Sequence, residues 1–581
     1  MTHFRRILVA NRGEIALRVF RAARELGIGC VAVYSEADRE ALHVRRADDA
    51  YLLGPGAPSA SYLDQDRVFE AAHRAGADAI HPGYGFLAEN ASFARRCAEE
   101  GIAWIGPPPE AIEAMGSKIR AREIMLAAGV PIVPGTTERV EDPARVIELG
   151  EQYGWPIALK AAAGGGGKGL KVVAGPDEAE RGLAAAQREG ESYFGDPAVY
   201  VEKYLADPRH VEVQLMADTH GAVVSLHERD CTLQRRHQKI VEETPSPAVT
   251  PEIRTRLGAM AIAAAKAVGY VGAGTIECLM DTTGDVFFLE MNTRIQVEHT
   301  ITEMATGIDL VREQILVAQG APLSFTQDDA VLRGHAIECR VNAEDPTTFL
   351  PSPGRVTRYR EPAGPGVRVD SALEQGGEVV ALYDPMVAKL VVWDRTRDLA
   401  RARMRRALDE MVVEGVRTLI PLHRLIMDAP EFARGETCAG LVEDVWPQQL
   451  TASDQPLATP ADPARSRSYV AEVDGRRFEV QVHAPDDPVL VEARRRRDAR
   501  RAGGGRSAAA GTVTSPMQGG VLKVEVAEGE AVAAGQVIAI IEAMKMENEI
   551  TAPRAGVVAE LQVTAGQTVT VGQAICRISD A

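Results

Sequence analysis

A tandem repeat near the C-terminus is the feature that most constrains the fold of this chain. Between residues 515 and 578, two segments carry proline, glycine, valine and isoleucine at matched positions 37 residues apart, as Pro516 and Pro553 are. Two quasi-equivalent β-rich halves of this size predict one small sandwich or flattened barrel. The link between the halves, residues 542–547 with sequence E-A-M-K-M-E, is then a tight turn with Lys545 at its centre.

Two methionines flank Lys545 at a position that should be exposed. Apolar side chains at an exposed turn cost solvation free energy, so something should use them. One interpretation is a surface lysine beside two incidental methionines, and the other is a lysine that carries a covalent group. The segment resembles the E-A-M-K-M motif of biotin carboxyl carrier domains, which implies a biotinyl-lysine at Lys545. Lipoyl domains share this fold, but methionines on both sides of the lysine favour biotin.

The composition excludes several classes of protein. The chain has 581 residues and a formal net charge of −17, which predicts several domains and argues against nucleic-acid binding. Seven scattered cysteines without a C-x-x-C pair indicate buried thiols in a reducing compartment, not disulfides or a zinc site. No apolar run is long enough for a signal peptide or a membrane span, so we expect a cytoplasmic protein with no membrane contact.

The first hundred residues alternate between strand and helix patterns, which predicts a doubly wound parallel sheet. A G-x-G-x-x-A pattern at residues 83–88 resembles a dinucleotide fingerprint, but no acidic residue ends the next strand. We therefore interpret it as a tight turn whose glycines allow close packing. The expected strands are 6–10, 30–35, 77–81 and 102–105, and the expected helices lie after Asn11-Arg12-Gly13 and near 64–75 and 90–100.

A glycine-rich segment lies between two predicted strands and comprises Gly164, Gly165, Gly166, Gly167, Lys168 and Gly169. It is not a Walker loop, because Gly169 replaces the required Ser or Thr and no helix follows. A β–glycine–β hairpin still offers unobstructed backbone N–H groups that can cover phosphates as a flexible lid. A hairpin tip without function would not account for Lys118 and Lys160 nearby, so phosphate binding is favoured. Ser117 is the expected N-cap of the helix that begins at Lys118.

Two acidic strand residues predict a metal site. If residue 280 pairs with residue 285, Glu277 and Glu290 lie diagonally on one face with Asn292, while Phe287 and Leu289 face the core. Neighbouring carboxylates repel unless a cation or a proton joins them, and carboxylate and amide oxygens suit Mg²⁺. The alternative is a pair of solvated strand acids beside an unrelated asparagine.

Basic residues on either side of this hairpin indicate an anion pocket. Arg294 and Glu298 directly follow the second strand, where they can meet a small oxyanion and a proton. Upstream, residues 234–239 read Q-R-R-H-Q-K, although a solvated basic loop would give the same pattern.

These segments together resemble biotin carboxylase, an ATP-grasp enzyme, over residues 3–447. The matching motifs are A-N-R-G-E-I-A at 10–16, H-P-G-Y-G-F-L at 81–87, G-G-G-G-K-G at 164–169, E-R-D-C at 228–231, Q-R-R-H-Q-K at 234–239, E-M-N-T-R-I-Q-V-E-H at 290–299 and E-C-R-V-N-A-E-D at 338–345. Two positions depart from the pattern: Thr300 stands where many relatives have proline, and Lys168 where others have arginine. We expect neither to alter the chemistry.

The resemblance implies a role for each matching residue. Glu298 would be the base that deprotonates bicarbonate, and Arg340 would stabilise the negative ureido oxygen of biotin. Magnesium or manganese would be held by Glu277, Glu290 and Asn292, and bicarbonate by Lys239, Arg294, Gln296 and Val297. ATP would be held by the glycine-rich lid together with Lys118, Lys160, Glu202, Lys203, Leu205, His210, Gln234 and His237.

The domain order follows from these segments. We expect a doubly wound N-terminal domain, an ATP-grasp domain, an α+β C-terminal domain, a linker and a small all-β biotinyl domain. Their predicted bounds are 1–116, 117–330, 331–447, 448–510 and 511–581. Within the linker, residues 469–482 alternate around Asp474-Gly475, which predicts a hairpin. Arginine- and glycine-rich residues 494–505 indicate a solvated, extended tether more than a nucleic-acid site, because aromatic residues are absent.

The predicted activity is half of a two-step reaction. ATP would activate bicarbonate as carboxyphosphate, and biotin on the carrier domain would take the carboxyl group. No carboxyltransferase-sized region is seen, so the arrangement resembles the α subunit of an acetyl- or propionyl-CoA carboxylase. It implies a biotin protein ligase, a hetero-oligomeric holoenzyme and a separate carboxyltransferase β subunit. The alternatives are an α-type subunit of pyruvate, methylcrotonyl-CoA or geranyl-CoA carboxylase, or a carrier scaffold with a decayed ATPase.

Overall fold

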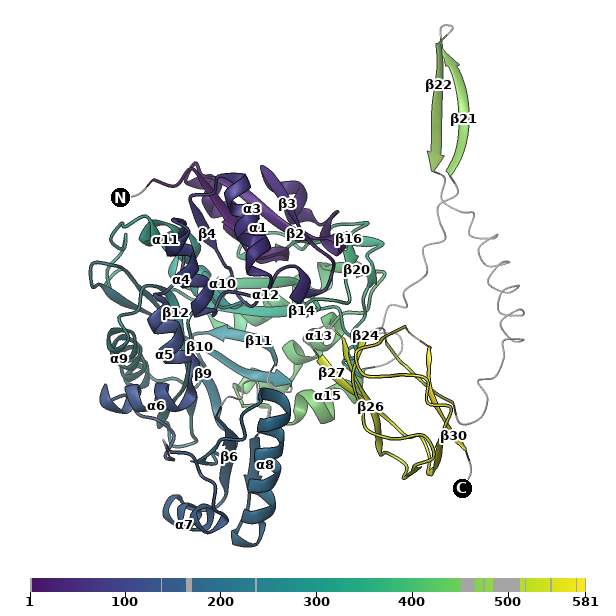
Figure 1. The fold of residues 1–581 in the computed structure, drawn as a ribbon. Helices are drawn as coiled ribbons and strands as arrows, with labels where there is room; N and C mark the ends of the chain where they lie inside the picture. The colour runs from purple at the N-terminus through teal and green to yellow at the C-terminus, as the bar shows by residue number, and fades with distance from the viewer. Residues whose placement is uncertain are drawn as a thin grey trace.

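The computed structural model describes residues 3–579 apart from 137, 163–169, 236–237, 451–465, 474–475, 484–511, 518, 544–545 and 571. Figure 1 shows an N-terminal α/β layer above a large central sheet, a smaller lobe below it and a β-sandwich beside them. The predicted fold class is confirmed in each of these parts. Among the described helices, none combines the length and the apolar character needed to cross a membrane.

The N-terminal layer is a parallel sheet with strand order β3-β2-β1-β4-β5. Side chains of β1 alternate between its two faces: Ile7 and Val9 pack with Phe20 of α1, whereas Leu8 packs with Phe69 of α3. Both faces are therefore buried, as the doubly wound prediction requires. The elements are β1 (Arg6–Val9), α1 (Gly13–Glu25), β2 (Gly29–Ser35), α2 (Leu42–Arg46), β3 (Asp49–Gly54), α3 (Gln65–Ala75), β4 (Ala79–His81), α4 (Ala91–Glu99) and β5 (Ala103–Trp104).

The central sheet is antiparallel and has the strand order β13-β12-β9-β10-β11-β14-β19-β17. It joins strands that are far apart in the sequence, because β11 pairs with β14. Its strands are β9 (Arg209–Ala217), β10 (Val223–Arg235), β11 (Gln238–Thr244), β12 (Gly272–Met280), β13 (Val286–Asn292), β14 (His335–Asn342), β17 (Val367–Ser371) and β19 (Met386–Asp394). The helices around it are α5 (Pro109–Gly116), α6 (Lys118–Ala127), α9 (Pro251–Ala267), α10 (His299–Thr306), α11 (Leu310–Ala318), α12 (Arg397–Glu410), α13 (Ile420–Asp428), α14 (Pro430–Arg434) and α15 (Trp446–Gln449). Two short pairs, β15 (Gly354–Arg355) with β18 (Glu378–Val379) and β16 (Arg358–Arg360) with β20 (Val412–Glu414), complete this part.

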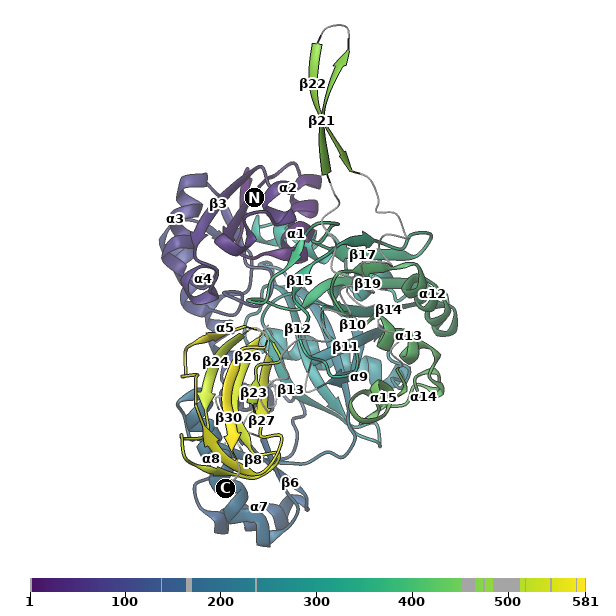
Figure 2. The ribbon, with the colours of Figure 1, turned by 90° about the vertical axis from the view of Figure 1, so that its right-hand side faces the viewer.

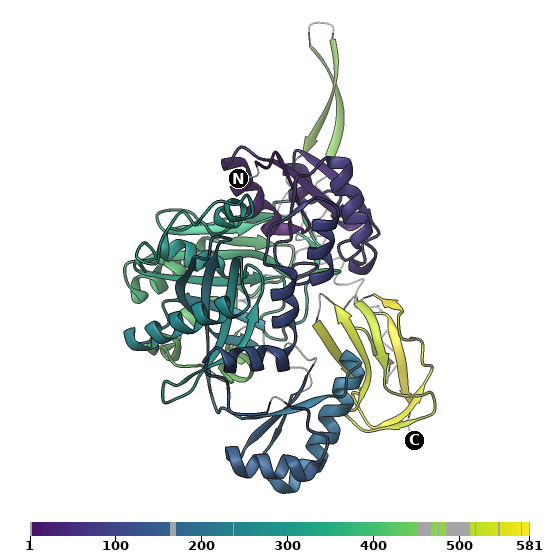
Figure 3. The same cartoon turned by 60° about the vertical axis from the view of Figure 1, so that its left-hand side comes forward.

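A smaller lobe carries the segment next to the glycine-rich stretch. Its antiparallel sheet has the order β7-β6-β8, and α7 and α8 pack on it (Figure 3). The lobe comprises α7 (Pro143–Tyr153), β6 (Ile157–Ala161), β7 (Leu170–Val173), α8 (Ala179–Phe194) and β8 (Val199–Lys203). Residues 163–169, which include the predicted glycine-rich lid, lie outside the described part of the chain.

The C-terminal repeat folds into two four-stranded sheets, β23-β30-β28-β25 and β27-β26-β24-β29. Each sheet takes strands from both repeat halves, since β25 pairs with β28 and β24 with β29. Repeat mates occupy equivalent sites, as Ile538 and Ile575 show in the core. The strands are β23 (Thr512–Thr514), β24 (Gly519–Val524), β25 (Ala531–Val532), β26 (Val537–Ala543), β27 (Met546–Thr551), β28 (Gly556–Ala559), β29 (Thr568–Val569) and β30 (Ala574–Ser579).

Close approach explains one repeated glycine pair. A Cβ at Gly519 would lie 2.3 Å from the carbonyl oxygen of Glu542, and one at Gly556 would lie 2.4 Å from that of Ser579. The two repeat halves therefore use glycine for the same physical reason, which is that the backbone of another strand lies too close to leave room for a side chain.

The linker hairpin predicted around Asp474-Gly475 is confirmed. Strands β21 (Ser466–Val473) and β22 (Arg476–His483) pair throughout, and Figure 2 shows them as one two-stranded ribbon. The two turn residues lie outside the described residues. All seven cysteines are buried and unpaired, as predicted.

Candidate active site

A cavity of about 1030 Å³ lies where the N-terminal layer, the small lobe and the central sheet meet. Most of the sequence-predicted site residues line it, although they come from segments more than 200 residues apart. These are Lys118, Lys160, Glu202, Lys203, Leu205, His210, Gln234, Lys239, Glu277, Glu290, Asn292, Arg294, Gln296, Val297 and Arg340. The predicted residues Gly164 to Gly169, His237 and Lys545 lie outside the described residues.

The predicted register of the acidic hairpin is wrong. Near the turn Met280 pairs with Val286 instead of Asp285, and a bulge shifts the register by one further residue, so that Cys278 opposes Phe288 but Glu277 lies directly opposite Glu290. A β-bulge places one extra residue on one strand and re-aims the side chains beyond it. Phe288 therefore packs in the core and Leu289 lines the cavity, the reverse of the expectation for Leu289. The bulge leaves both carboxylates on the cavity side, closer together than predicted.

The pKa values of these two carboxyl groups shift in opposite directions. Burial, reinforced by Glu277, raises the pKa of Glu290. Burial would also raise the pKa of Glu277, but Lys239 and His210 hold that pKa below its usual range. Asn292 donates from Nδ2 to Oε1 of Glu277 at 2.9 Å, so all three predicted metal ligands adjoin. Hard oxygen donors with excess negative charge suit a divalent cation such as Mg²⁺.

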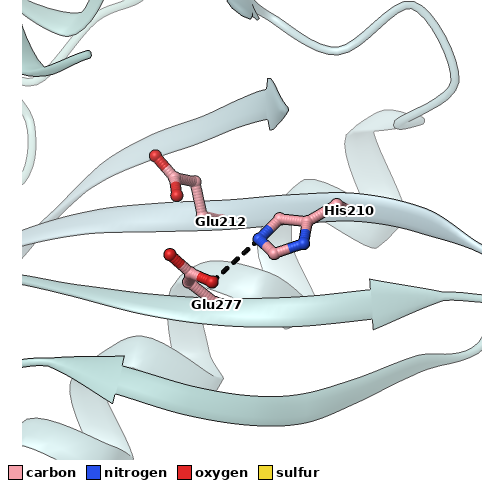
Figure 4. Close-up of side chains that lie close together, drawn as sticks. All are labelled: His210, Glu212 and Glu277. Carbon is pink, nitrogen blue, oxygen red and sulfur yellow. Dashed lines mark ion pairs between the residues drawn. The ribbon is translucent and has the colours of Figure 1, made fainter. Parts of the chain in front are cut away.

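His210 joins the same cluster from β9. Its Nε2 lies 2.9 Å from Oε2 of Glu277, and Figure 4 shows Glu212 beside the pair. Ligand atoms of these three residues lie within 4.8 Å of one another, so they could hold a metal ion. Burial lowers the pKa of His210, but Glu277 outweighs it and the pKa is raised. In this arrangement, His210 acts as a cationic partner of Glu277.

Lys239 occupies the centre of the acidic cluster. Its Nζ lies 2.6 Å from Glu212 Oε2, 3.1 Å from Glu277 Oε1 and 2.6 Å from Glu298 Oε1. Burial opposes its charge, but the surrounding acids raise the pKa of Lys239 well above its usual value. The lysine is therefore a fixed positive charge in a low-dielectric site, which is what a small anion needs.

Glu298 is fully buried between two cations that line the cavity. Oε1 accepts from Lys239, and Oε2 accepts from Nη2 of Arg340 at 2.9 Å. Burial would raise its pKa, but Lys239 and Arg340 hold the pKa of Glu298 well below its usual range. The carboxylate is thus ionised and can accept a proton. A substrate that draws the two cations away would make it a stronger base.

Arg294 is held by a three-way set of hydrogen bonds. It donates from Nε to Glu89 at 2.9 Å, from Nη2 to Asn292 at 2.8 Å and from Nη1 to Gln296 at 2.9 Å. Glu89 also accepts from the backbone of Thr293 at 3.1 Å, so the N-terminal layer fixes the segment after β13. A pre-organised guanidinium of this kind is suited to an oxyanion.

A second group of charged residues in the cavity comprises Lys118, Lys160 and Glu202. Glu202 pairs with both Lys160 and the buried Arg122, which also donates to the carbonyl of Val133 at 2.9 Å. Burial lowers the pKa of Lys118, while Glu290 acts in the opposite direction. Lys118 and Lys160 thus provide positive charge for phosphates next to the acidic hairpin.

Not every basic residue singled out from the sequence serves the cavity. Arg229 is fully buried and donates to Glu212 at 2.6 Å, to Gln214 at 2.7 Å and to Thr302 at 3.0 Å. Its guanidinium therefore binds the sheet together. Arg235 lines the cavity but also stacks 4.1 Å above the ring of Phe349.

The G-x-G-x-x-A segment is part of the cavity wall. Asn11 donates at 2.7 Å to the carbonyls of both Pro82 and Tyr84, and Tyr84 and Phe86 line the cavity. The sequence indicated only a tight turn here.

Glu212 was also missed in the sequence analysis. On β9, His210, Glu212 and Gln214 alternate with apolar residues, and polar residues on one face of a buried central strand are a pattern that could have identified it.

The comparisons with known proteins agree with this geometry. Family models match as "Biotin carboxylase, N-terminal domain" over residues 3–112, "Carbamoyl-phosphate synthase L chain, ATP binding domain" over 117–326, "Biotin carboxylase C-terminal domain" over 338–444 and "Biotin-requiring enzyme" over 511–578. A pyruvate carboxylase subunit of Methanothermobacter thermautotrophicus is 54% identical over 442 residues, 76% of this chain and 90% of that protein. The chain belongs to the biotin carboxylase family.

The resemblance of this biotin carboxylase family member continues beyond residue 447. The biotin-dependent acyl-coenzyme A carboxylase alpha3 subunit of Mycobacterium leprae is 45% identical over 561 residues, covering 94% of each chain. The biotin carboxylase domain of the Hydrogenobacter thermophilus 2-oxoglutarate carboxylase, solved with MgADP, ADP and bicarbonate, is 46% identical with a TM-score of 0.72. That match covers 75% of this chain and 96% of the solved one. The family member thus combines the three carboxylase domains with a biotin-requiring domain.

Proposed function

We propose that this chain is the α subunit of a biotin-dependent acyl-CoA carboxylase. It would use ATP and bicarbonate to carboxylate biotin carried on its own Lys545, and a separate β subunit would transfer the carboxyl group to acetyl-CoA or propionyl-CoA. The observation that carries the proposal is the junction of Lys239, Glu298 and Arg340 at the cavity, in a chain that aligns over 94% of its length with an acyl-CoA carboxylase α subunit.

The proposed chemistry divides the cavity residues between the phosphates of ATP and a divalent metal. Lys118, Lys160 and the glycine-rich segment would hold the phosphates of ATP, and Glu277, Glu290 and Asn292 would hold Mg²⁺ or Mn²⁺. The bound metal would neutralise charge during phosphoryl transfer. The remaining predicted nucleotide contacts are Glu202, Lys203, Leu205, His210, Gln234 and His237.

Bicarbonate would bind between Lys239 and Arg294, with Gln296 and the backbone of Val297. When the anion draws Lys239 away from Glu298, the carboxylate can accept the bicarbonate proton, and oxygen attack on the γ-phosphorus of ATP gives carboxyphosphate and ADP. Arg340 would then face the ureido oxygen of biotin and stabilise its negative charge.

The carrier domain would receive biotin from a biotin protein ligase. Strands β26 and β27 pair as far as Ala543 and Met546, so Lys545 belongs to the connection of that hairpin. A covalent carrier on such a hairpin can visit the cavity and then a partner subunit, and the arginine- and glycine-rich residues 494–505 would supply the tether.

The test is to isolate the complex from the native host, supply labelled bicarbonate and identify which compound receives the labelled carboxyl group. We expect a carboxyltransferase subunit to co-purify and acetyl-CoA or propionyl-CoA to take the label. The second candidate, a pyruvate carboxylase subunit, is favoured by the 54% identity to such a subunit. In that case pyruvate takes the label and the acyl-CoA esters do not.

A further inference from the structure

Two buried acids that the proposed function does not use lie directly behind Arg340. Glu242 on β11 and Glu338 on β14 are Cα partners in the antiparallel pair, so their side chains project from the same face. Both are fully buried. Adjacent buried carboxyl groups cannot both ionise without a large cost, so such a pair requires an explanation.

The hydrogen bonds of the two acids differ. Glu242 accepts from Nε of Arg340 through Oε1 at 2.5 Å, whereas Glu338 accepts through Oε2 from the hydroxyl of Thr300. The other oxygen of each group, Oε2 of Glu242 and Oε1 of Glu338, is buried without a partner. Each acid therefore has one satisfied oxygen and one orphaned oxygen.

The charges around the pair indicate which acid holds a proton. Glu242 has Arg340 as a direct ion-pair partner, while no ion pair joins Glu338 to a cation in the described part of the chain. The charged groups that face Glu338 are Glu242 from β11, Arg340 from β14 and Lys389 from β19, with the neutral Thr300 from α10. Burial and the neighbouring Glu242 raise the pKa of Glu338 well above its usual value.

We propose that Glu338 carries a proton that it shares with Glu242, and that this pair positions Arg340 at the cavity. A proton on Oε1 of Glu338 would donate to Oε2 of Glu242 and satisfy both orphaned oxygens at once. Glu242 then stays anionic and fixed, and its Oε1 holds Nε of Arg340. The guanidinium is thereby aimed from two sides, by Glu242 at Nε and by Glu298 at Nη2.

This inference rests on the proposed function, because it matters for catalysis only if Arg340 meets biotin. Glu242 and Glu338 touch neither biotin nor the phosphates in this arrangement, so they are positioning residues. Thr300 supplies the second hydrogen bond to Glu338. Thr300, which the sequence analysis noted as a departure from the family pattern, therefore has a definite contact.

The first measurement is spectroscopic and does not depend on activity. Infrared difference spectra of the full chain at pH 8, unsubstituted protein minus Glu338→Gln, should contain the carbonyl band of one buried protonated carboxyl group. A difference spectrum without that band would overturn the shared proton.

The second measurement is the kinetics of carboxylation of free biotin. Glutamine at residue 338 can donate to Glu242 and accept from Thr300, as the protonated acid does, so Glu338→Gln should keep kcat/KM within about twofold. Glu338→Leu removes the donor and should lower kcat/KM for biotin about tenfold, with the KM for ATP unchanged. Equal losses in both variants, or an equal loss in ATP binding, would contradict the positioning role.

The two readouts separate failure of the inference from failure of the proposed function. If the unsubstituted protein carboxylates no biotin although it is folded and supplied with magnesium, the proposed function fails, and the infrared band still decides the shared proton. If biotin is carboxylated but the two variants behave alike, only the positioning role fails.

Discussion

At the scale of single residues, Glu298 shows how a cluster sets the state of one side chain. Alone in a buried site, a carboxyl group would stay protonated. Lys239 and Arg340 reverse this and keep Glu298 ionised. The same two cations suit bicarbonate and a ureido oxygen, so substrate binding and activation of the base are coupled by competition for the same charges.

Substitution of Glu298 tests the assignment of the base. Glu298→Gln keeps the size of the side chain but can accept from only one of Lys239 and Arg340, and it cannot take a proton, so we expect turnover to fall by about 10² to 10⁴. ATP affinity should change little, because Glu298 contacts Lys239 and Arg340, which are not among the proposed nucleotide contacts. Steady-state carboxylation of free biotin and nucleotide titration measure the two quantities. A large loss of nucleotide affinity would remove Glu298 from the role of base.

Lys545 can be tested independently of the carboxylase half. Lys545→Ala should abolish covalent biotin and carboxylation of the carrier, and it should leave carboxylation of free biotin intact. Streptavidin blotting after denaturation measures the label, with Lys523→Ala, an exposed lysine of the same domain, as the matched control. Persistent labelling of Lys545→Ala would show that the biotin site lies elsewhere.

The sequence predicts the identity of the site residues better than their contacts. The motifs at 164–169, 234–239 and 290–299 indicated the chemistry, because such combinations of glycine, basic and acidic residues seldom occur by chance. The register at Glu277 could not be predicted, since a bulge between β12 and β13 depends on how β12 pairs with β9 and on the helices beneath. Glu242 and Glu338 were missed because their pairing joins strands 96 positions apart in the numbering.

At the scale of elements, the loop between β14 and β15 is built around one aspartate. Asp345 accepts from the backbones of Thr347 and Thr348 at 2.9 Å, and its own N–H donates to the carbonyl of Leu350. Phe349 adopts a positive φ of 58°, an uncommon conformation for an aromatic residue, and lies under Arg235. These contacts therefore fix the position of Leu350, whose neighbour Phe349 lies under Arg235 of the cavity wall.

Glu344, at the start of this loop, should make stability depend on pH. Burial raises the pKa of Glu344 to about 7, above its ordinary value of 4.5. A raised acid pKa contributes stability that is present below pH 4.5 and is lost as the pH rises through 7. The full shift corresponds to about 3 kcal/mol at most.

Glu344→Gln should remove that dependence while its oxygen still accepts from Asn342. Between pH 5 and pH 8, the unfolding temperature of the unsubstituted protein should fall more than that of the variant. Differential scanning calorimetry at the two pH values measures the difference between the proteins, so contributions common to both cancel. Parallel curves would show that Glu344 stays ionised in the folded state.

At the scale of the whole molecule, the hydrophobic core of the carrier half is separate from those of the carboxylase half, and among the described residues Leu350 of the carboxylase half packs against it. The apolar core of the sandwich has Leu350 packed against it, and Leu350 belongs to the loop that also carries Phe349 beneath Arg235 of the cavity wall. No sequence pattern indicates such a contact, because periodicity describes how a segment buries its own face and not which distant domain covers it.

This contact predicts different effects on free and carrier-bound biotin. Leu350→Asp places a charge against the carrier core and loses about 1–2 kcal/mol of apolar burial, which corresponds to about a tenfold weaker docking of the carrier. Carboxylation of the attached biotin, measured as label from bicarbonate retained on the protein, should slow by a similar factor. Carboxylation of free biotin should not change, because Leu350 does not line the cavity. Leu399→Asp, at an exposed leucine of α12, is the matched control and should affect neither reaction. If Leu350→Asp slowed both reactions equally, the loop would act on the cavity itself, and if it slowed neither, the carrier would reach the cavity without this contact.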